Sequence, residues 1–79
     1  MNELQHRVAE GRRRILLGER PVYHVTTSWD GAAVEVRIRE LPIIHLFVPD
    51  GSVALDGARV LISRTLGVDP TAFAVEPER

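Results

Sequence analysis

Arginine side chains near the N-terminus are the residues of this chain best suited to binding a charged partner. All ten cationic residues of the chain are arginine, and four of them fall within residues 7–14. This arginine cluster consists of Arg7, Arg12, Arg13 and Arg14. A planar guanidinium group binds a phosphate or a carboxylate through two parallel hydrogen bonds. The cluster therefore predicts contact with a nucleic acid or with an acidic protein surface.

The arginine cluster also has a purely structural interpretation. Cations near the C-terminal end of a helix interact favourably with the helix dipole and solvate an exposed face. Three consecutive arginines also point around most of the helical circumference, so they do not form one stripe. The sequence leaves both interpretations open, and a small nucleic-acid-binding regulatory protein is the alternative hypothesis for function.

Histidine, serine and acidic residues show no pattern typical of a metal centre or a catalytic site. His24 and His45 fall on two predicted strands that flank a third, which separates them by about 9–10 Å. That distance is too long for a shared metal ion. The serines lack the G-x-S-x-G context of an activated nucleophile, and most aspartates sit in turns, where they hydrogen-bond to the backbone. We predict no catalytic residue, no metal site and no cofactor, and expect that the protein is not an enzyme.

Apolar side chains in a predicted hairpin and in the third predicted strand are candidates for a protein interface. These residues are Trp29, Ile44, Leu46, Phe47 and Val48. Trp29 is the only tryptophan and lies beside the turn residues Asp30 and Gly31. There it either packs on a neighbouring element or anchors a partner, since tryptophan is enriched at binding hot spots.

Composition limits the chain to a single small domain. Its 79 residues are too few for two hydrophobic cores, and a hydrophobic content of 44% excludes a disordered chain. The chain has no cysteine, so a partner subunit is expected to add stability. A net charge of −1 excludes a broadly basic protein that coats nucleic acid. The opening residues do not resemble a signal peptide and no apolar run is long enough to span a membrane, so we expect a cytoplasmic protein.

The first predicted element is a helix over residues 2–17. Asn2 is a favourable N-cap, and apolar or small residues follow at helical spacing. They are Leu4, Val8, Gly11 and Ile15. Gly18 suits the left-handed position that ends a helix, and Pro21 prevents continuation. Residues 1–20 are therefore predicted to form a helix and a hinge.

Three strands are predicted next. Residues 22–28 are rich in β-branched and aromatic side chains, and the Asp-Gly turn after them is a strong hairpin signal. Val34, Val36 and Ile38 alternate with charged residues, which predicts a second strand with one buried face. A proline then precedes the third strand, over residues 43–48. This strand is apolar almost throughout, so we expect it to be buried on both faces or against a partner.

The last part of the chain predicts a second helix and a final strand. Ser52 is the expected cap of a helix that ends at Gly67, and residues 72–76 form the final strand. These elements predict an α+β fold in which an N-terminal helix precedes a β-β-β-α-β unit. The sheet order is 3-2-1-4, mostly antiparallel, with one crossover helix on a face. The third strand is then an edge, which favours pairing with a copy of this chain or with another protein.

Several short motifs resemble those of the HicB-like family of small bacterial and phage proteins, especially actinobacterial members. The similar pieces are Tyr23-His24-Val25, Trp29-Asp30-Gly31, Glu40-Leu41-Pro42, the helix with Arg59, Ile62 and Leu66, Val68-Asp69-Pro70, and the final Phe73, Val75 and Glu76. The resemblance covers about two-thirds of the chain. It assigns residues 21–79 to a HicB-like domain that follows the N-terminal helix and hinge.

The resemblance implies a partial, non-catalytic RNase H-like fold and a role as an antitoxin. Typical members bind and block a small HicA-type mRNA interferase. The chain departs from the family where Ile43 follows Pro42, since a glycine is usual there. An N-terminal helix is predicted, and no DNA-binding segment is expected after Val75, where typical members often have one. The leading hypothesis is therefore a homodimeric protein-binding module whose partner is a small toxin or a host protein.

Overall fold

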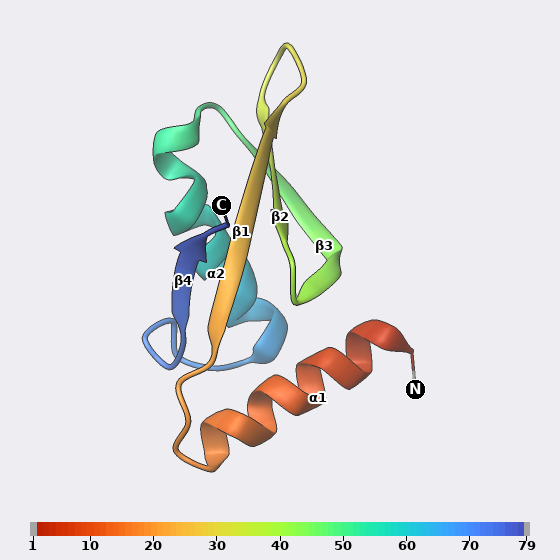
Figure 1. Cartoon of the computed structure of the whole chain (residues 1–79), viewed down its shortest axis with the longest axis vertical. Coiled ribbons are helices and arrows are strands. Elements are labelled where there is room, and N and C mark those ends of the chain that lie inside the picture. Colours follow the sequence, from red (N-terminus) through yellow and green to blue (C-terminus); the bar gives the residue numbers. More distant parts are fainter. Residues whose placement is uncertain (1, 79) are drawn as a thin grey trace.

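The computed structural model describes residues 2–78, which form two α-helices, one 3-10 helix and four strands (Figure 1). In chain order they are α1 (Glu3–Leu16), β1 (Val22–Trp29), β2 (Val34–Ile38), β3 (Leu41–Val48), η1 (Gly51–Val53), α2 (Ala54–Leu66) and β4 (Ala74–Pro77). The predicted α+β fold and element order are confirmed. No helix in this part of the chain is long and apolar enough to cross a membrane.

The strands form one mixed sheet in the order β3-β2-β1-β4, as predicted. β2 pairs antiparallel with β1 and with β3, while β4 lies parallel to β1. A parallel return requires a crossover connection, and α2 supplies it on one face of the sheet.

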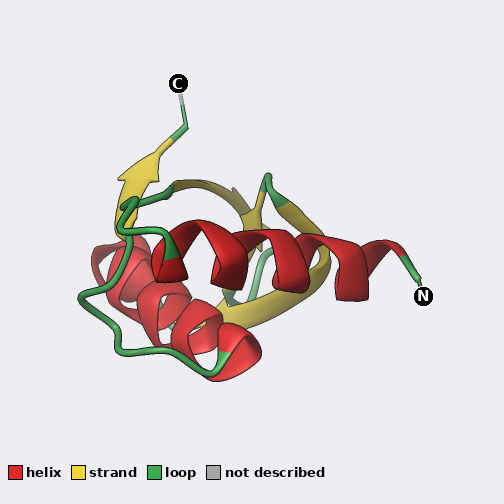
Figure 2. Ribbon diagram, turned by 90° about the horizontal axis from the view of Figure 1, so that it is seen from below, coloured by secondary structure: helices red, strands yellow, loops and turns green. Residues whose placement is uncertain are grey.

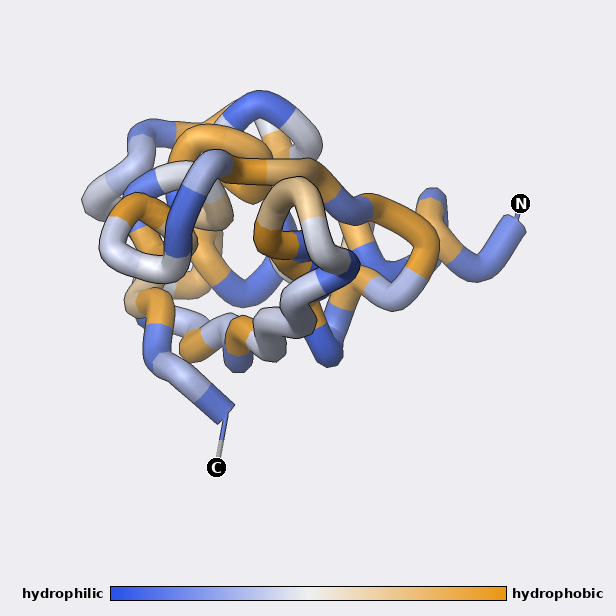
Figure 3. Tube along the Cα trace, turned by 90° about the horizontal axis from the view of Figure 1, so that it is seen from above, coloured by the Kyte–Doolittle hydropathy of each residue, from blue (hydrophilic) through white to orange (hydrophobic). Residues whose placement is uncertain are grey.

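The core lies between α2 and this face of the sheet. α2 buries every fourth residue, Ala54, Ala58, Ile62 and Leu66. The sheet contributes the alternating residues of β1 and β2, and Phe73 just before β4 is fully buried. The hydropathy-coloured trace shows apolar segments running through the middle of the molecule, with hydrophilic residues toward both chain ends (Figure 3). The predicted buried face of β2 is confirmed at Val34, Val36 and Ile38.

Helix α1 lies across one end of the sheet and of α2, and leaves the face of the sheet opposite α2 uncovered (Figure 2). Asn2 caps it as predicted, in a capping box with Gln5. Its apolar stripe packs on the core, and Gly11 is buried where the helix approaches Tyr23 and Leu66. The helix ends at Leu16, and Gly18 follows in the left-handed conformation with a positive φ of 87°. The linker to β1 contains the boundary predicted between residues 1–20 and 21–79.

Several predicted boundaries differ from the structure. β3 begins at Leu41 and includes Pro42, because an edge strand tolerates a residue without an N–H donor. The prediction that Ser52 caps the second helix is wrong: Asp50 accepts a hydrogen bond from the Ser52 N–H and caps η1. α2 follows with no side-chain cap. β4 begins two residues later than predicted, because the chain first buries Phe73.

Candidate protein-binding surface

The sheet face opposite α2 carries mostly polar side chains. Along the strands, every second residue points to this side, so the register brings Thr26, Arg37 and His45 into one row. The next row contains Ser28, Glu35 and Phe47. No other element covers these rows within residues 2–78, and we call this surface the open face.

An ion-pair network joins β2 to β3 on the open face. Glu35 accepts hydrogen bonds from Arg37 Nε at 3.1 Å and from His45 Nδ1 at 2.8 Å. The His45 hydrogen bond, followed by that of Arg37, holds the pKa of Glu35 below its ordinary value. The side chains of Arg37 and His45 are about half exposed, so the network contributes little to stability at ordinary salt.

A second network connects β1 to the β2–β3 turn. The Glu40 carboxylate accepts hydrogen bonds from the His24 backbone N–H at 2.7 Å and from His24 Nδ1 at 2.6 Å. Arg39 lies beside it and donates to Glu78 at 2.7 Å. Partial burial raises the pKa of Glu40, but the two His24 hydrogen bonds outweigh this effect and leave that pKa below its ordinary value.

Replacing Glu40 by glutamine should lower stability in a pH-dependent way. A carboxyl group with a lowered folded-state pKa stabilises the fold above its unfolded pKa of about 4.3, and this contribution is lost as the pH falls through the folded value. Urea unfolding should show E40Q less stable than wild type at pH 7, with the difference shrinking toward pH 3. Glu76→Gln is the control, because its carboxylate accepts no hydrogen bond from residues 2–78. A constant difference across this pH range would contradict the assignment.

His24 and His45 belong to separate networks, on the two strands that flank β2. Among residues 2–78, no group of three or more histidine, aspartate or glutamate side chains is arranged to hold a metal ion. A shallow hollow of about 580 Å3 lies beside His24 on the open face. Its lining is formed by His24, Arg39, Glu76, Pro77 and Glu78.

Three members of the arginine cluster are neutralised by neighbouring glutamates. The pairs are Arg7 with Glu3 at 2.9 Å, Arg13 with Glu10 at 2.8 Å and Arg14 with Glu19 at 3.0 Å. Arg12 is exposed, and no carboxylate in the described part of the chain pairs with it. Sequence spacing contained this signal for two of the pairs, since Glu3–Arg7 and Glu10–Arg13 are helical neighbours. The cluster thus presents little uncompensated positive charge to a phosphate backbone.

The apolar candidates on β3 divide between the core and the open face. Val48 is buried, while Ile44 and Leu46 are half-buried and pack on the core. Phe47 points to the open face and is 55% exposed. Of the two alternatives predicted for β3, burial on both faces is wrong within this chain, and burial against a partner stays a prediction. Ile43, which sequence reasoning did not select, is 56% exposed.

The outer edge of β3 carries unpaired backbone groups. The Arg39 N–H donates to the His24 carbonyl oxygen, so these two residues are a hydrogen-bonded pair. Along the antiparallel β1–β2 ladder such pairs alternate with pairs whose backbone groups point away from each other. Val34 and Val36 therefore turn their backbone groups toward β3, where they meet Val48 and Leu46. The N–H and C=O groups of the residues between, His45 and Phe47, consequently point away from the sheet. Residues 42–44 have no partner on β2 and bulge from the strand, so the regular edge is short.

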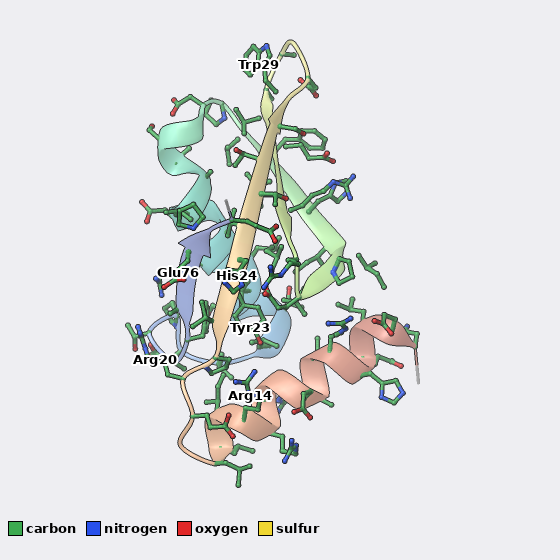
Figure 4. The ribbon with its side chains drawn as sticks, viewed as in Figure 1. Arg14, Arg20, Tyr23, His24, Trp29 and Glu76 are labelled. Carbon is green, nitrogen blue, oxygen red and sulfur yellow. The ribbon has the colours of Figure 1, made fainter. Side chains whose placement is uncertain are left out.

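Trp29 lies near the tip of the β1–β2 hairpin (Figure 4) and is 64% exposed. Of its two predicted environments, the structure shows the exposed one. Its register partner is the buried Val34, so Trp29 is on the α2 side of the sheet, whereas Phe47 is on the open face. The exposed interface candidates thus belong to two separate surfaces.

Comparisons with known proteins give no relative for this chain. No protein-family model, no curated protein and no solved structure matches it.

Proposed function

We propose that this chain is a non-enzymatic, HicB-like protein-binding module that pairs its β3 edge with a strand of another protein or of a second copy. The observation that carries the proposal is the β3 edge itself. Outward N–H and C=O groups at His45 and Phe47 lie beside the exposed aromatic ring of Phe47. Extended segments bind such edges through backbone hydrogen bonds, and neighbouring side chains select the partner.

A protein partner is favoured over a nucleic acid. The arginine cluster is largely paired with glutamates, and the open face contains carboxylates as well as arginines. A surface with balanced charge suits a mixed protein surface better than a phosphate backbone, whose binding depends on uncompensated cations. A gel shift that disappears when Arg12 is replaced by alanine would instead support the nucleic-acid-binding alternative.

The resemblance to HicB-like proteins makes a small HicA-type mRNA interferase the first partner to test, in the cytoplasm. The experiment is co-expression with the toxin-sized product of an adjacent reading frame, followed by co-purification and a growth-rescue assay. Complex formation with rescue of growth supports the antitoxin role. A toxin that neither binds nor is neutralised removes that role and leaves self-association as the test of the β3 edge.

Replacing Phe47 by arginine should weaken self-association or partner binding at least tenfold, since it removes the apolar contact beside the unpaired edge and adds a charge. Size-exclusion chromatography with light scattering measures the mass of wild type and variant over a concentration series. Val60→Arg is the matched control, because Val60 is 49% exposed on α2 and its substitution adds the same charge away from β3. Equal association of wild type and Phe47→Arg, or a strictly monomeric wild type that binds no toxin, would contradict the proposal.

A further inference from the structure

β1 extends four residues beyond its pairing with β4. The β1–β4 ladder covers Val22–Val25, and its last hydrogen bond runs from the Glu78 N–H to the Val25 carbonyl oxygen at 2.8 Å. Residues 26–29 have no neighbouring strand on this side within the described chain. Because Thr26 and Ser28 turn their backbone groups toward β2, those of Thr27 and Trp29 point outward.

This free edge faces a groove between β1 and the start of α2. The groove has a volume of about 480 Å3. Its lining is formed by Val25, Thr26, Thr27, Gly51, Ala54, Leu55, Pro77 and Glu78. One wall is therefore a strand edge with unpaired backbone groups, and the other is the first turn of a helix with an exposed leucine. Trp29 continues the row of Val25 and Thr27 beyond the groove, on the same side of the sheet.

We propose that this groove binds an extended segment of a partner protein, which adds to the sheet in line with β4 and hydrogen-bonds to Thr27 and Trp29. A strand of about four residues spans the free edge, at roughly 3.3 Å per residue. Alternate side chains of the segment would face Leu55 and Trp29, so these positions should be apolar. A strand edge beside a helix is a recurrent way to bind extended peptides, with backbone groups providing affinity and the flanking pocket providing selectivity.

The charge at this end of the molecule indicates that the segment is basic. Asp30, Asp50 and Asp56 belong to the hairpin turn, η1 and the first turn of α2, and all three are exposed. Arg37 on the neighbouring strand β2 and Arg39 just after it are paired with glutamates. Arginine or lysine residues flanking the apolar positions would therefore complement the rim of the groove. This surface is separate from the β3 edge, and the inference does not depend on the proposed function.

A panel of capped seven-residue peptides tests the inference directly. Each peptide has arginine at both ends and alternates threonine with valine, isoleucine, leucine or phenylalanine. The single tryptophan reports binding, because a peptide beside Trp29 should shift its fluorescence to shorter wavelength. Hydrogen exchange of the Thr27 and Trp29 amides should slow at least tenfold at saturating peptide. A peptide with N-methylated residues at the pairing positions should bind at least tenfold more weakly.

Variants on α2 complete the test. Leu55→Arg places bulk and positive charge on the groove wall and should reduce peptide affinity at least tenfold. Val60→Arg adds the same charge about 140° around the helix and should leave affinity unchanged, and circular dichroism should show both variants folded. Failure of every peptide at millimolar concentration to change Trp29 fluorescence or amide exchange overturns the inference. Hydrogen exchange of the Thr27 and Trp29 amides that slows as the protein concentration rises, with no peptide present, also overturns the inference. A second copy of the chain would then occupy the edge.

Discussion

Replacing Phe73 by alanine is expected to lower the free energy of unfolding by about 3–5 kcal/mol. Phe73 is fully buried and packs edge-to-face on Tyr23, with ring centroids 5.7 Å apart. Arg59 also contacts this segment. Its guanidinium group lies 5.7 Å from the Phe73 ring centroid and donates a hydrogen bond to the Pro70 carbonyl oxygen at 2.6 Å. Loss of the ring therefore leaves a cavity and removes the anchor that holds β4 against β1.

A loss of this size is comparable with the whole stability of a domain this small, which is of the order of 4–12 kcal/mol. Urea unfolding followed by circular dichroism measures it. Phe73→Leu retains most of the apolar volume, so its free energy of unfolding should fall by clearly less. Trp29→Ala, at an exposed position, should lower the free energy of unfolding least of the three. A Phe73→Ala protein as stable as wild type would show that the cluster around Arg59 and Tyr23 does not hold β4.

Replacing Gly11 by alanine is expected to destabilise the protein by about 1–3 kcal/mol, although alanine favours a helix by about 1 kcal/mol over glycine. A Cβ atom at this position would overlap the Tyr23 hydroxyl group, which lies in the buried contact between α1 and the core. The clash should outweigh the gain in helix propensity.

The hydroxyl group provides a specific test of this explanation. In a Tyr23→Phe background the overlapping atom is absent, so Gly11→Ala should become much less harmful or even stabilising. A double-mutant cycle measured by urea unfolding quantifies this coupling. Gly57→Ala is a matched comparison, because its Cβ would lie 3.1 Å from Leu46 Cδ1 and 3.3 Å from Val48 Cγ1, a contact that a small shift relieves. Equal effects of Gly11→Ala in both backgrounds would contradict the explanation.

The order of elements and the sheet topology could be predicted because local signals agreed with one another. The alternation of Val34, Val36 and Ile38 marked the buried face of β2, and Gly18 marked the end of α1. The pattern on β3 was ambiguous, because a nearly continuous apolar run predicted burial either on both faces or against a partner. In the structure Leu41 is buried, but Ile43, His45 and Phe47 are exposed, and Phe47 lies on the open face.

The candidate surfaces depend on geometry that sequence patterns do not contain. The groove beside β1 exists because β4 is shorter than β1 and because the 3-10 turn at Gly51–Val53 carries the start of α2 to the sheet edge. The ion pairs of the arginine cluster could be predicted only in part from sequence spacing. The Arg14–Glu19 pair forms across the end of α1, where the chain leaves the helix and helical spacing no longer applies. Burial of Phe73 ahead of β4 likewise depended on the turn at Pro70.

The position of α1 has a consequence for how the molecule fluctuates. The helix covers one end of the core and is joined to it by a short linker with a glycine at its start. The β-β-β-α-β unit keeps its own fully buried residues, Val36, Ile38, Ile62 and Phe73. Opening of α1 should therefore expose less apolar surface than global unfolding, so we expect the helix to open at a lower free energy than the β-β-β-α-β unit. Such opening would uncover the end of the core around Tyr23 and Leu66, where Gly11 of α1 now packs.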